Sequence, residues 1–438
     1  MVIYELLGII TIFWGFSMIV KKDIFAPESL LCLSYIFAII CAIANINNWS
    51  INLHYNTLII IIIGLLSFII PSCLYFIYEQ TSKEKKIVNN LEHIEIKKYK
   101  IVILDIISFF IGIIYTLYFI KAIGGISAFS NYSVAMETYR YKTAFHNENL
   151  IPAWINFLSK SCRAICYIYT YVIINNVINR KKNKTMKKEK NLIFLIIGIC
   201  IYIPLTLMSG GRYDLIVYVL YTIMIFNILF VIKNKKRLEF KRIFKIFIII
   251  ILILTFFSSY RGLVGRNSEN SGLDYITEYF GGSIEIFDIY MQKEHVTPKE
   301  FGHETFYGIH KFLSQLKLLD EDLSNKSAMT FVVVNNKVIG NVYTGFRKMY
   351  NDFGTYGVII LQVVLSIIFN KLYYGCFYKE KNKGISFRII IVGSLCFCLA
   401  LHSYSEAFFS NVLSFNYAAF FIILYVIIKF LNKEIEVK

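Results

Sequence analysis

Several signatures of common enzyme classes are absent from this 438-residue sequence. It has no Walker loop, so no ATP-driven pump is implied. His303 has no second histidine at the spacing of a zinc motif, and Gly281-Gly282-Ser283 is not a nucleophile elbow. The sequence therefore implies no metal and no other cofactor.

Cysteine is absent from the polar loops, although the chain contains nine cysteines. All nine lie in or beside apolar stretches, so a disulfide framework is not expected. The first apolar stretch lacks the basic start and the small-residue cleavage site of a secretory signal peptide, and we expect it to stay in the mature protein. Internal repeats and low-complexity linkers are also absent, which favours one membrane domain with an outward elaboration.

Long apolar stretches are what the sequence has in abundance. Hydrophobic residues make up 57% of the chain and the mean hydropathy is +0.57, above the roughly 45–50% apolar content of a soluble domain. The stretches are continuously apolar and about 17–25 residues long, the length that crosses a hydrocarbon core as a helix. They predict an all-α polytopic membrane protein of about eleven spans, near 2–20, 28–45, 57–78, 100–121, 153–178, 192–208, 214–232, 243–257, 356–374, 387–402 and 411–430.

The distribution of charge predicts an orientation. The formal net charge is +17, and the basic residues gather in alternate connections, namely 83–100, 180–190, 233–245 and 379–388. The positive-inside rule places these connections and the C-terminal tail in the cytoplasm and the N-terminus outside. This pattern indicates a multi-pass membrane protein rather than a protein that binds nucleic acid.

Three regions then follow. Residues 1–257 hold spans one to eight, residues 258–355 form a large outward loop, and residues 356–438 hold spans nine to eleven and the tail. The spans contain few charges, Asp105, Lys160 and Arg163 being exceptions near span ends. Polar residues concentrate instead in three outward segments.

The first outward segment, 122–152, mixes aromatic residues with both charges at 136–142. Such a mixture suits a sugar or a lipid head group, but also a short interfacial helix. The second, Ser209-Gly210-Gly211-Arg212-Tyr213-Asp214, is a tight turn before a helix. Arg212 there fits a diphosphate site, or an arginine that reaches the head groups.

The third segment is the large loop, which opens with Arg261 and Arg266 directly after the eighth span. Arginines are unexpected on an outward surface, and a phosphate-bearing substrate would account for them. Residues 275–290 predict an amphipathic helix, so some of its acids belong to a solvated face. Sugar donors carrying a diphosphate can react without ATP when arginines neutralise the leaving group and one base deprotonates the acceptor hydroxyl.

Several short polar stretches, in their order along the chain, resemble those of the bacterial oligosaccharide repeat unit polymerases, the O-antigen or Wzy-type family. The matching stretches are Ser209-Gly210-Gly211-Arg212, Tyr260-Arg261-Gly262, Glu278-Tyr279-Phe280-Gly281-Gly282, Asn341-Val342-Tyr343-Thr344, Asp352-Phe353-Gly354-Thr355-Tyr356-Gly357 and Ser405-Glu406-Ala407-Phe408-Phe409-Ser410-Asn411. They cover about the last half of the chain. The resemblance implies a GT-C-like fold and undecaprenyl-diphosphate-linked oligosaccharides as donor and acceptor. It also implies membrane lipids, a chain-length regulator and a flippase as partners.

The resemblance implies that four arginines bind the diphosphate of the donor, namely Arg212, Arg261, Arg266 and Arg347. We expect the base to be Glu278 or His303, although such residues on an outward loop are often solvated or structural. Sugars are expected to contact Tyr279, Tyr343 and Asp352.

The alternatives are an O-antigen ligase, which would pass a finished glycan to another acceptor, a flippase or other transporter, and a structural or sensory membrane protein. Transporters tend to place polar residues near the bilayer midplane and to show internal repeats.

Overall fold

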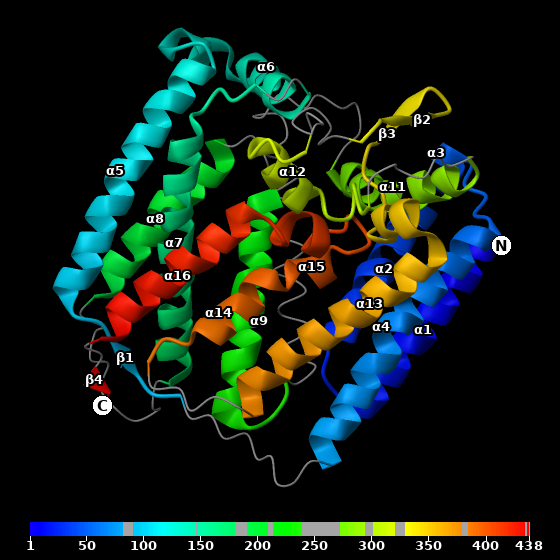
Figure 1. Cartoon of the computed structure of the whole chain (residues 1–438), viewed down its shortest axis with the longest axis horizontal. Coiled ribbons are helices and arrows are strands. Elements are labelled where there is room, and N and C mark those ends of the chain that lie inside the picture. Colours follow the sequence, from blue (N-terminus) through cyan, green and yellow to red (C-terminus); the bar gives the residue numbers. More distant parts are fainter. Residues whose placement is uncertain are drawn as a thin grey trace.

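The computed structural model shows a protein built almost entirely of helices (Figure 1). It describes residues 1–81, 91–145, 148–179, 191–208, 213–238, 272–293, 301–319, 329–378, 384–433 and 436–437. Each predicted span within these residues overlaps one or more helices. The eighth span, 243–257, lies outside the described residues.

One group of helices packs around the N-terminal hairpin, on the right of Figure 1. Its core joins buried aliphatic and aromatic side chains from segments far apart in sequence, such as Leu65, Phe68 and Phe346. Pro27 begins the second helix at a position where a missing N–H costs nothing. The members are α1 (Val2–Lys21), α2 (Pro27–Ala44), α4 (Tyr55–Thr81), α11 (Gly272–Met291) and α13 (Phe346–Tyr378).

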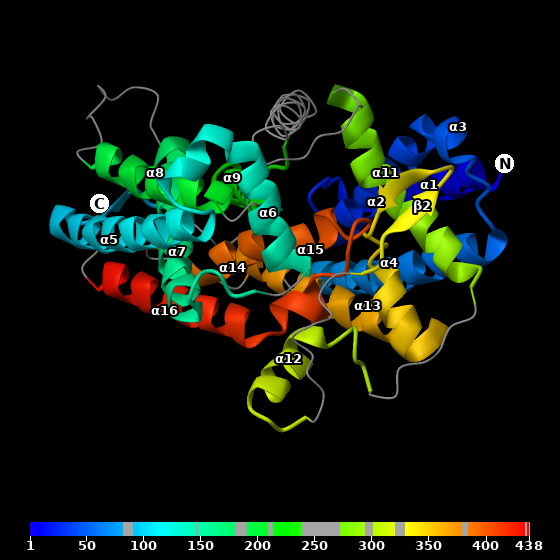
Figure 2. The same ribbon diagram turned by 90° about the horizontal axis from the view of Figure 1, so that it is seen from above.

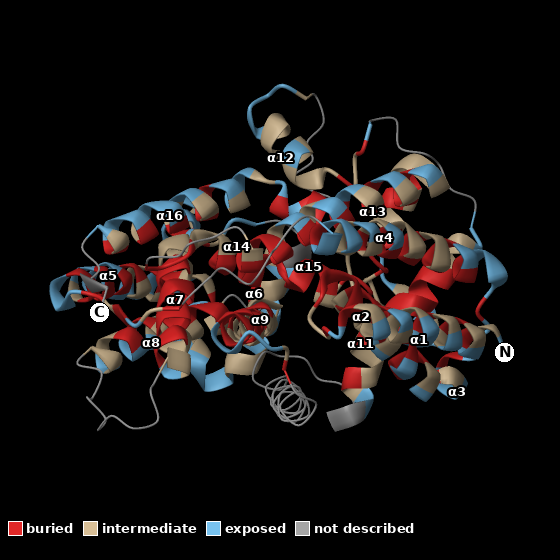
Figure 3. Ribbon diagram, turned by 90° about the horizontal axis from the view of Figure 1, so that it is seen from below, coloured by how far each residue is buried: buried red, intermediate tan, exposed pale blue. Residues whose placement is uncertain are grey.

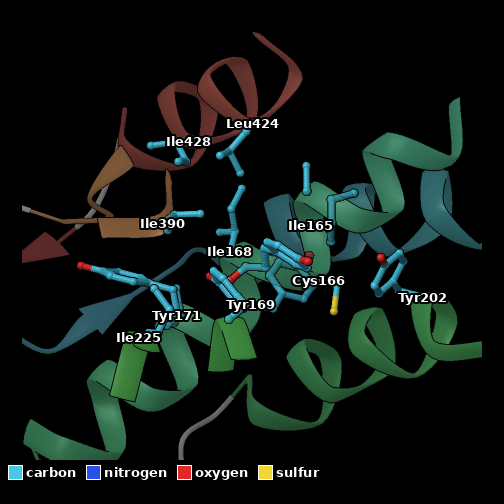
Figure 4. Packing of buried hydrophobic residues seen from close by; sticks show 14 of the residues in the cluster. Ile165, Cys166, Ile168, Tyr169, Tyr171, Tyr202, Ile225, Ile390, Leu424 and Ile428 are labelled. Atoms are coloured by element: carbon cyan, nitrogen blue, oxygen red, sulfur yellow. The ribbon is translucent and has the colours of Figure 1, made fainter. Parts of the chain in front are cut away.

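A second group lies on the left of Figure 1 and is centred on α7 (Ala153–Asn179), which contacts every other member. Figure 4 shows Tyr169 and Tyr171 of α7 among side chains from its neighbours. Because α7 is surrounded by protein, its sequence can be more polar than that of a helix facing lipid. The other members are α5 (Lys98–Ala122), α8 (Leu192–Met208) and α16 (Phe415–Asn432).

Three helices connect the two groups. The longest, α9 (Tyr213–Asn234), packs on α7 and also contacts α13. It also packs against α14 (Phe387–Leu395) and α15 (Phe397–Ala400), which together replace the single predicted span 387–402. Gly393 permits this contact, because a Cβ there would lie 2.7 Å from Ile225.

Short elements gather at the ends where the predicted outward segments lie, and we call this the loop side. They are α3 (Ile46–Trp49), the 3-10 helix η1 (Ile126–Asn131), α6 (Tyr132–Phe145), α12 (Tyr307–Gln315), the hairpin β2 (Val332–Val334) and β3 (Lys337–Gly340), and the π-helix η4 (Phe408–Val412). In the view from above, α12 projects from the body of the molecule (Figure 2).

Paired glycines bring α11 against the first group. A Cβ on Gly281 would lie 2.6 Å from the backbone of Cys41 and Ala42 in α2, and one on Gly282 would lie 2.8 Å from Ile339 in β3. Larger side chains would therefore separate α11 from both neighbours. The large loop is consequently packed into the helical body through α11.

The opposite ends of the helices form what we call the basic side, where predicted cytoplasmic segments meet. Strand β1 (Ile94–Glu95) pairs antiparallel with β4 (Glu436–Val437) next to the C-terminus. Asn432 exchanges two hydrogen bonds of 3.0 Å with the backbone of Ile385. Three segments predicted to share one side of the membrane thus lie together.

Two ion pairs with buried carboxylates lie near the basic side. Lys21 Nζ is 2.9 Å from Glu28 Oε1, with both side chains fully buried, and Ser72 donates to the second oxygen of Glu28 at 2.6 Å. Asp23 binds Arg237 at 2.8 Å and accepts a hydrogen bond of 2.8 Å from Tyr373. Lys21 is therefore a buried partner of Glu28 rather than a solvated lysine at a helix end.

The helices have the length and surface of a multi-pass membrane protein. Among the described residues, seven helices are long and apolar enough to cross a membrane: α1, α2, α4, α5, α9, α13 and α16. Phe109 and Phe110 of α5 are 56% and 60% exposed, and exposed residues cover the outer sides of the peripheral helices (Figure 3). Lipid would cover such surface. The helices α8 and α14–α15 are apolar but shorter, so the count of eleven spans stays a prediction.

Two helix starts differ from the prediction. Helix α13 begins at Phe346 rather than near 356 and is interrupted at Gly354, whose φ of 62° favours glycine. Helix α16 begins at Phe415, after η4, rather than at 411, and the side chain of Ser414 caps it by accepting from Tyr417 N. Both differences lie on the loop side, where polar contacts reshape the helix ends.

Candidate functional site

Segments from the last half of the chain meet on the loop side. Gly345 N donates to the carbonyl of His402 at 2.8 Å, and a Cβ on Gly345 would lie 2.5 Å from the His402 ring. Tyr279 and Tyr404 stack at 5.0 Å and share a hydroxyl hydrogen bond of 2.6 Å. We call the assembly of residues 279, 301–306, 343–352 and 402–411 the junction.

The centre of the junction is an arginine paired with an acid. The guanidinium of Arg347 forms an ion pair with Glu304 and lies 4.8 Å from the ring of Tyr290 and 5.3 Å from that of Tyr343. Asp352 accepts hydrogen bonds from the backbone of this same turn, 2.6 Å from Thr305 N and 3.1 Å from Glu304 N. Arg347 and Asp352 thus hold the 301–306 turn against α13.

The junction also contains a buried Lys–Ser–Glu arrangement around η4. Lys348 Nζ donates to Ser410 Oγ at 3.0 Å. The Glu406 carboxylate accepts from Phe409 N at 2.6 Å and Ser410 N at 2.8 Å, and burial raises the pKa of Glu406 while the charge of Lys348 lowers it. Because a carboxylate caps the first N–H groups of η4, this uncommon helix has a fixed position.

His402 connects the junction to the helical body. Its ring is buried, with Nδ1 3.1 Å from Tyr35 Oη of α2 and Nε2 3.0 Å from Gln362 Nε2 of α13. A histidine bonded through both nitrogens and enclosed by packed rings is a positioning residue. It fixes where α15 ends and where η4 can begin.

A cavity of about 1060 Å³ opens beside the junction. Its walls come from α5, α6, the α6–α7 connection, the first three turns of α7, α12, η4 and the start of α16. Ser410 and Asn411 of η4 line it, so the cavity and the junction share an edge. Its volume is at the upper end of the range for small-molecule sites, roughly 300–1,000 Å³.

The lining of the cavity combines cations, amides and aromatic rings. Three basic residues line it, Lys160, Arg163 and Lys311, and Glu148 is the one acid of the lining within the described residues. The lining also includes amide and aromatic side chains: Asn149, Trp154, Asn156, Phe157, Tyr307, Phe312, Gln315, Phe415, Asn416 and Tyr417. Aromatic faces and amides are the side chains that bind sugar rings, and cations bind phosphate.

The arginine of the cavity is held by rings rather than by an acid. Arg163 Cζ lies 4.8, 5.2 and 5.4 Å from the rings of Phe420, Tyr167 and Tyr417. Its Nε and Nη2 atoms are buried and have no hydrogen-bond partner in the described part of the chain. The charge of Asp214, at the start of α9, acts on Arg163, but Asp214 does not line the cavity.

The structure describes six of the nine predicted site residues. Arg347, Tyr279, Tyr343 and Asp352 lie in the junction, which His303 joins at the 301–306 turn. Glu278 lies partly buried on α11, and neither it nor His303 lines the cavity. The remaining three predicted residues, Arg212, Arg261 and Arg266, lie outside the described residues.

Lys160 and Arg163 were not among the predicted site residues, although their signal is visible in the sequence. Both are charged residues inside an otherwise apolar stretch, where a charge is costly and marks a functional site by default. Lys311 and Glu148 carry no comparable signal, because they are ordinary polar residues of loop-side segments.

No known protein family, curated protein or solved structure matches the chain. The fold and the two loop-side features therefore carry the functional argument.

Proposed function

We propose that the protein is a polymerase of undecaprenyl-diphosphate-linked oligosaccharide repeat units, with a GT-C-like fold in a bacterial cell membrane and its loop side outward. One observation supports this most. Stretches that resemble the polymerase family, at 278–282, 341–352 and 405–411, are far apart in sequence and meet in the junction, next to a basic, aromatic cavity.

The cavity provides the types of side chain that the reaction needs. The growing glycan would leave its lipid carrier when the acceptor hydroxyl oxygen bonds to the anomeric carbon. The bond from that carbon to the diphosphate breaks, and its electron pair leaves with the diphosphate. Cationic side chains stabilise the leaving group, and a base accepts the hydroxyl proton.

Glu148 joins Glu278 and His303 as a candidate base because it is the acid that lines the cavity in the described residues. Glu148 is exposed, so a bound acceptor could reach it. The Arg347–Glu304 pair, by contrast, holds the junction together, which gives Arg347 a positioning role beside its predicted contact with the diphosphate.

The test is to incubate the purified protein in nanodiscs with a defined undecaprenyl-diphosphate-linked repeat unit and to separate the products by size. A ladder of polymer supports the proposal. Transfer of a single finished chain to another acceptor would identify a ligase, and movement of the lipid across the bilayer without new glycosidic bonds would identify a flippase. The variants E148Q, E278Q and H303A distinguish the bases, because loss of the ladder in only one of them assigns the role.

A further inference from the structure

The cavity contains a partly buried guanidinium, that of Arg163, which forms no ion pair within the described residues. The cost of an unpaired guanidinium in a low-dielectric setting is large, and buried charges are normally paired. In the described part of the chain, Arg163 interacts with the rings of Phe420, Tyr167 and Tyr417 and with the two tyrosine hydroxyls, while its Nε and Nη2 remain without hydrogen-bond partners. Cation–π contacts recover part of the cost but satisfy no N–H.

The two lysines of the cavity also lack an acidic partner among the described residues. Lys160 Nζ donates to Asn416 Oδ1 at 2.6 Å and lies 5.0 Å from the ring of Phe157. Lys311 Nζ lies 6.0 Å from the ring of Tyr307. With Glu148 as the one acid of the lining, the cavity has a net positive charge. These three cations come from two different helices, α7 and α12, so the charge is not the face of one solvated helix.

The depth of Arg163 indicates the type of ligand. It lies ten residues after Ala153, the first residue of α7, which corresponds to about 15 Å along a helix. Lys311 lies on α12, which packs across η4 and the start of α16. A ligand that contacts both cations would extend from the loop-side rim into the helical body, between aromatic walls. This arrangement suits an amphiphile with a phosphate-bearing polar part.

We propose that this cavity binds the phosphate groups of an amphipathic substrate, with Arg163 as the deep ligand and Lys160 and Lys311 at the rim. The inference rests on the proposed function for the identity of the amphiphile. It assigns the phosphate to residues other than the loop arginines that the resemblance indicates. A planar guanidinium can donate two parallel hydrogen bonds to a phosphate, and its two buried N–H groups then gain partners.

The experiment is a binding measurement on the full-length protein in nanodiscs, using farnesyl diphosphate, farnesol and inorganic pyrophosphate as probes. We expect farnesyl diphosphate to bind and farnesol to bind much more weakly. R163Q, K160Q and K311Q should each weaken binding by about tenfold, the value of one charge-assisted hydrogen bond. R163K should lose part of that affinity, because a point charge cannot replace the bidentate contact.

The matched control is K337Q, since Lys337 is an exposed lysine of β3 outside the cavity lining; the affinity of this variant for farnesyl diphosphate should not change. If R163Q does not fold, K311Q and R163K give the answer, because both keep the deep charge. Pyrophosphate binding as tightly as farnesyl diphosphate would support the anion site and identify free diphosphate as its ligand. Wild-type affinity for farnesyl diphosphate in R163Q, K160Q and K311Q would overturn the proposal.

The two proposals fail in different ways. If the wild-type protein binds farnesyl diphosphate through Arg163 but makes no polymer from any lipid-linked repeat unit, the phosphate site is supported and the polymerase function is refuted. If polymer forms and R163Q binds farnesyl diphosphate with wild-type affinity, the polymerase function is supported and the phosphate site is refuted.

Discussion

The basic side and the cavity on the loop side differ in how their charged side chains are paired. Near the basic side, Lys21 faces Glu28, and Asp23 faces Arg237, and each carboxylate also accepts a hydrogen bond from a hydroxyl group. On the loop side, Arg163 lines a cavity without an acidic partner in the described residues. Charges paired within the protein tie helices together, whereas a charge left unpaired next to a cavity is available to a ligand.

The first prediction breaks a pair on the basic side. K21M leaves Glu28 charged and buried, and we expect it to lower the free energy of unfolding by about 3–5 kcal/mol. SDS titration in mixed micelles measures this change. The double variant K21M/E28Q should recover most of the loss, because no uncompensated charge remains. K22M is the control, since Lys22 is exposed, and an equal loss in K22M would contradict the argument.

The second prediction concerns an acid of the loop side. Burial, and then the charge of Asp288, raise the pKa of Glu285 to about 7, and its Oε2 has no partner in the described residues. An acid with a raised pKa stabilises the fold below its unfolded value of about 4.5, and this stabilisation is lost as the pH rises through 7. Because water reaches part of the site, we expect a loss of about 2 kcal/mol between pH 5 and 8.

Unfolding curves at both pH values check this loss. E285Q should remove most of the pH dependence, whereas D274N, at an exposed position of the same helix, should keep it. An unchanged pH dependence in E285Q would show that another group titrates. Asp288 is the paired neighbour, bonded to His54 Nδ1 at 2.9 Å and to Thr57 at 2.5 Å.

The third prediction tests a neutral contact of the junction. Y279F removes the hydroxyl that shares a 2.6 Å hydrogen bond with Tyr404 but keeps the ring stack. We expect a loss of about 1 kcal/mol in the free energy of unfolding. Y356F, at a position 79% exposed, should show no measurable change in the same assay. If Tyr279 also positions a sugar, polymer synthesis should fall further than stability does.

The smallest effect on stability should come from Arg163, although its effect on function should be the largest. R163Q loses three ring contacts but also removes an unpaired buried charge, so the two terms offset to within about 1 kcal/mol. Polymer synthesis at limiting substrate, by contrast, should fall by about tenfold, in line with the weaker binding. A loss of stability as large as that of K21M would show that Arg163 has a structural partner and would remove the contrast between the two sides.

The helices could be predicted from the sequence because the apolar stretches are long and continuous. The segments 2–20 and 100–121 lie within α1 and α5, and the segment 192–208 has the bounds of α8. Helix ends could not be predicted where polar contacts decide them. The start of α13 at Phe346 depends on backbone and side-chain contacts to residues 304 and 402, which no local pattern encodes.

The candidate site could be predicted only in part. The junction contains predicted residues such as Tyr279 and Asp352, because the order of the resembling stretches indicates them. The partners that hold them, Tyr404 and Thr305, come from distant segments and carry no signal of their own. The sequence shows Arg163 as a charge within an apolar stretch. Whether an acid forms an ion pair with it depends on which helices surround α7.

The distribution of cysteines has a practical consequence for mapping the membrane orientation. All nine are free, and eight lie within helices while Cys396 lies between α14 and α15. The hairpin of β2 and β3 contains none, and Lys337 at its tip is exposed. A thiol introduced by K337C would therefore react with a membrane-impermeant maleimide, and we expect little labelling of the native cysteines within the helices. Labelling of intact cells would then report which compartment the cavity opens to, before any substrate is known.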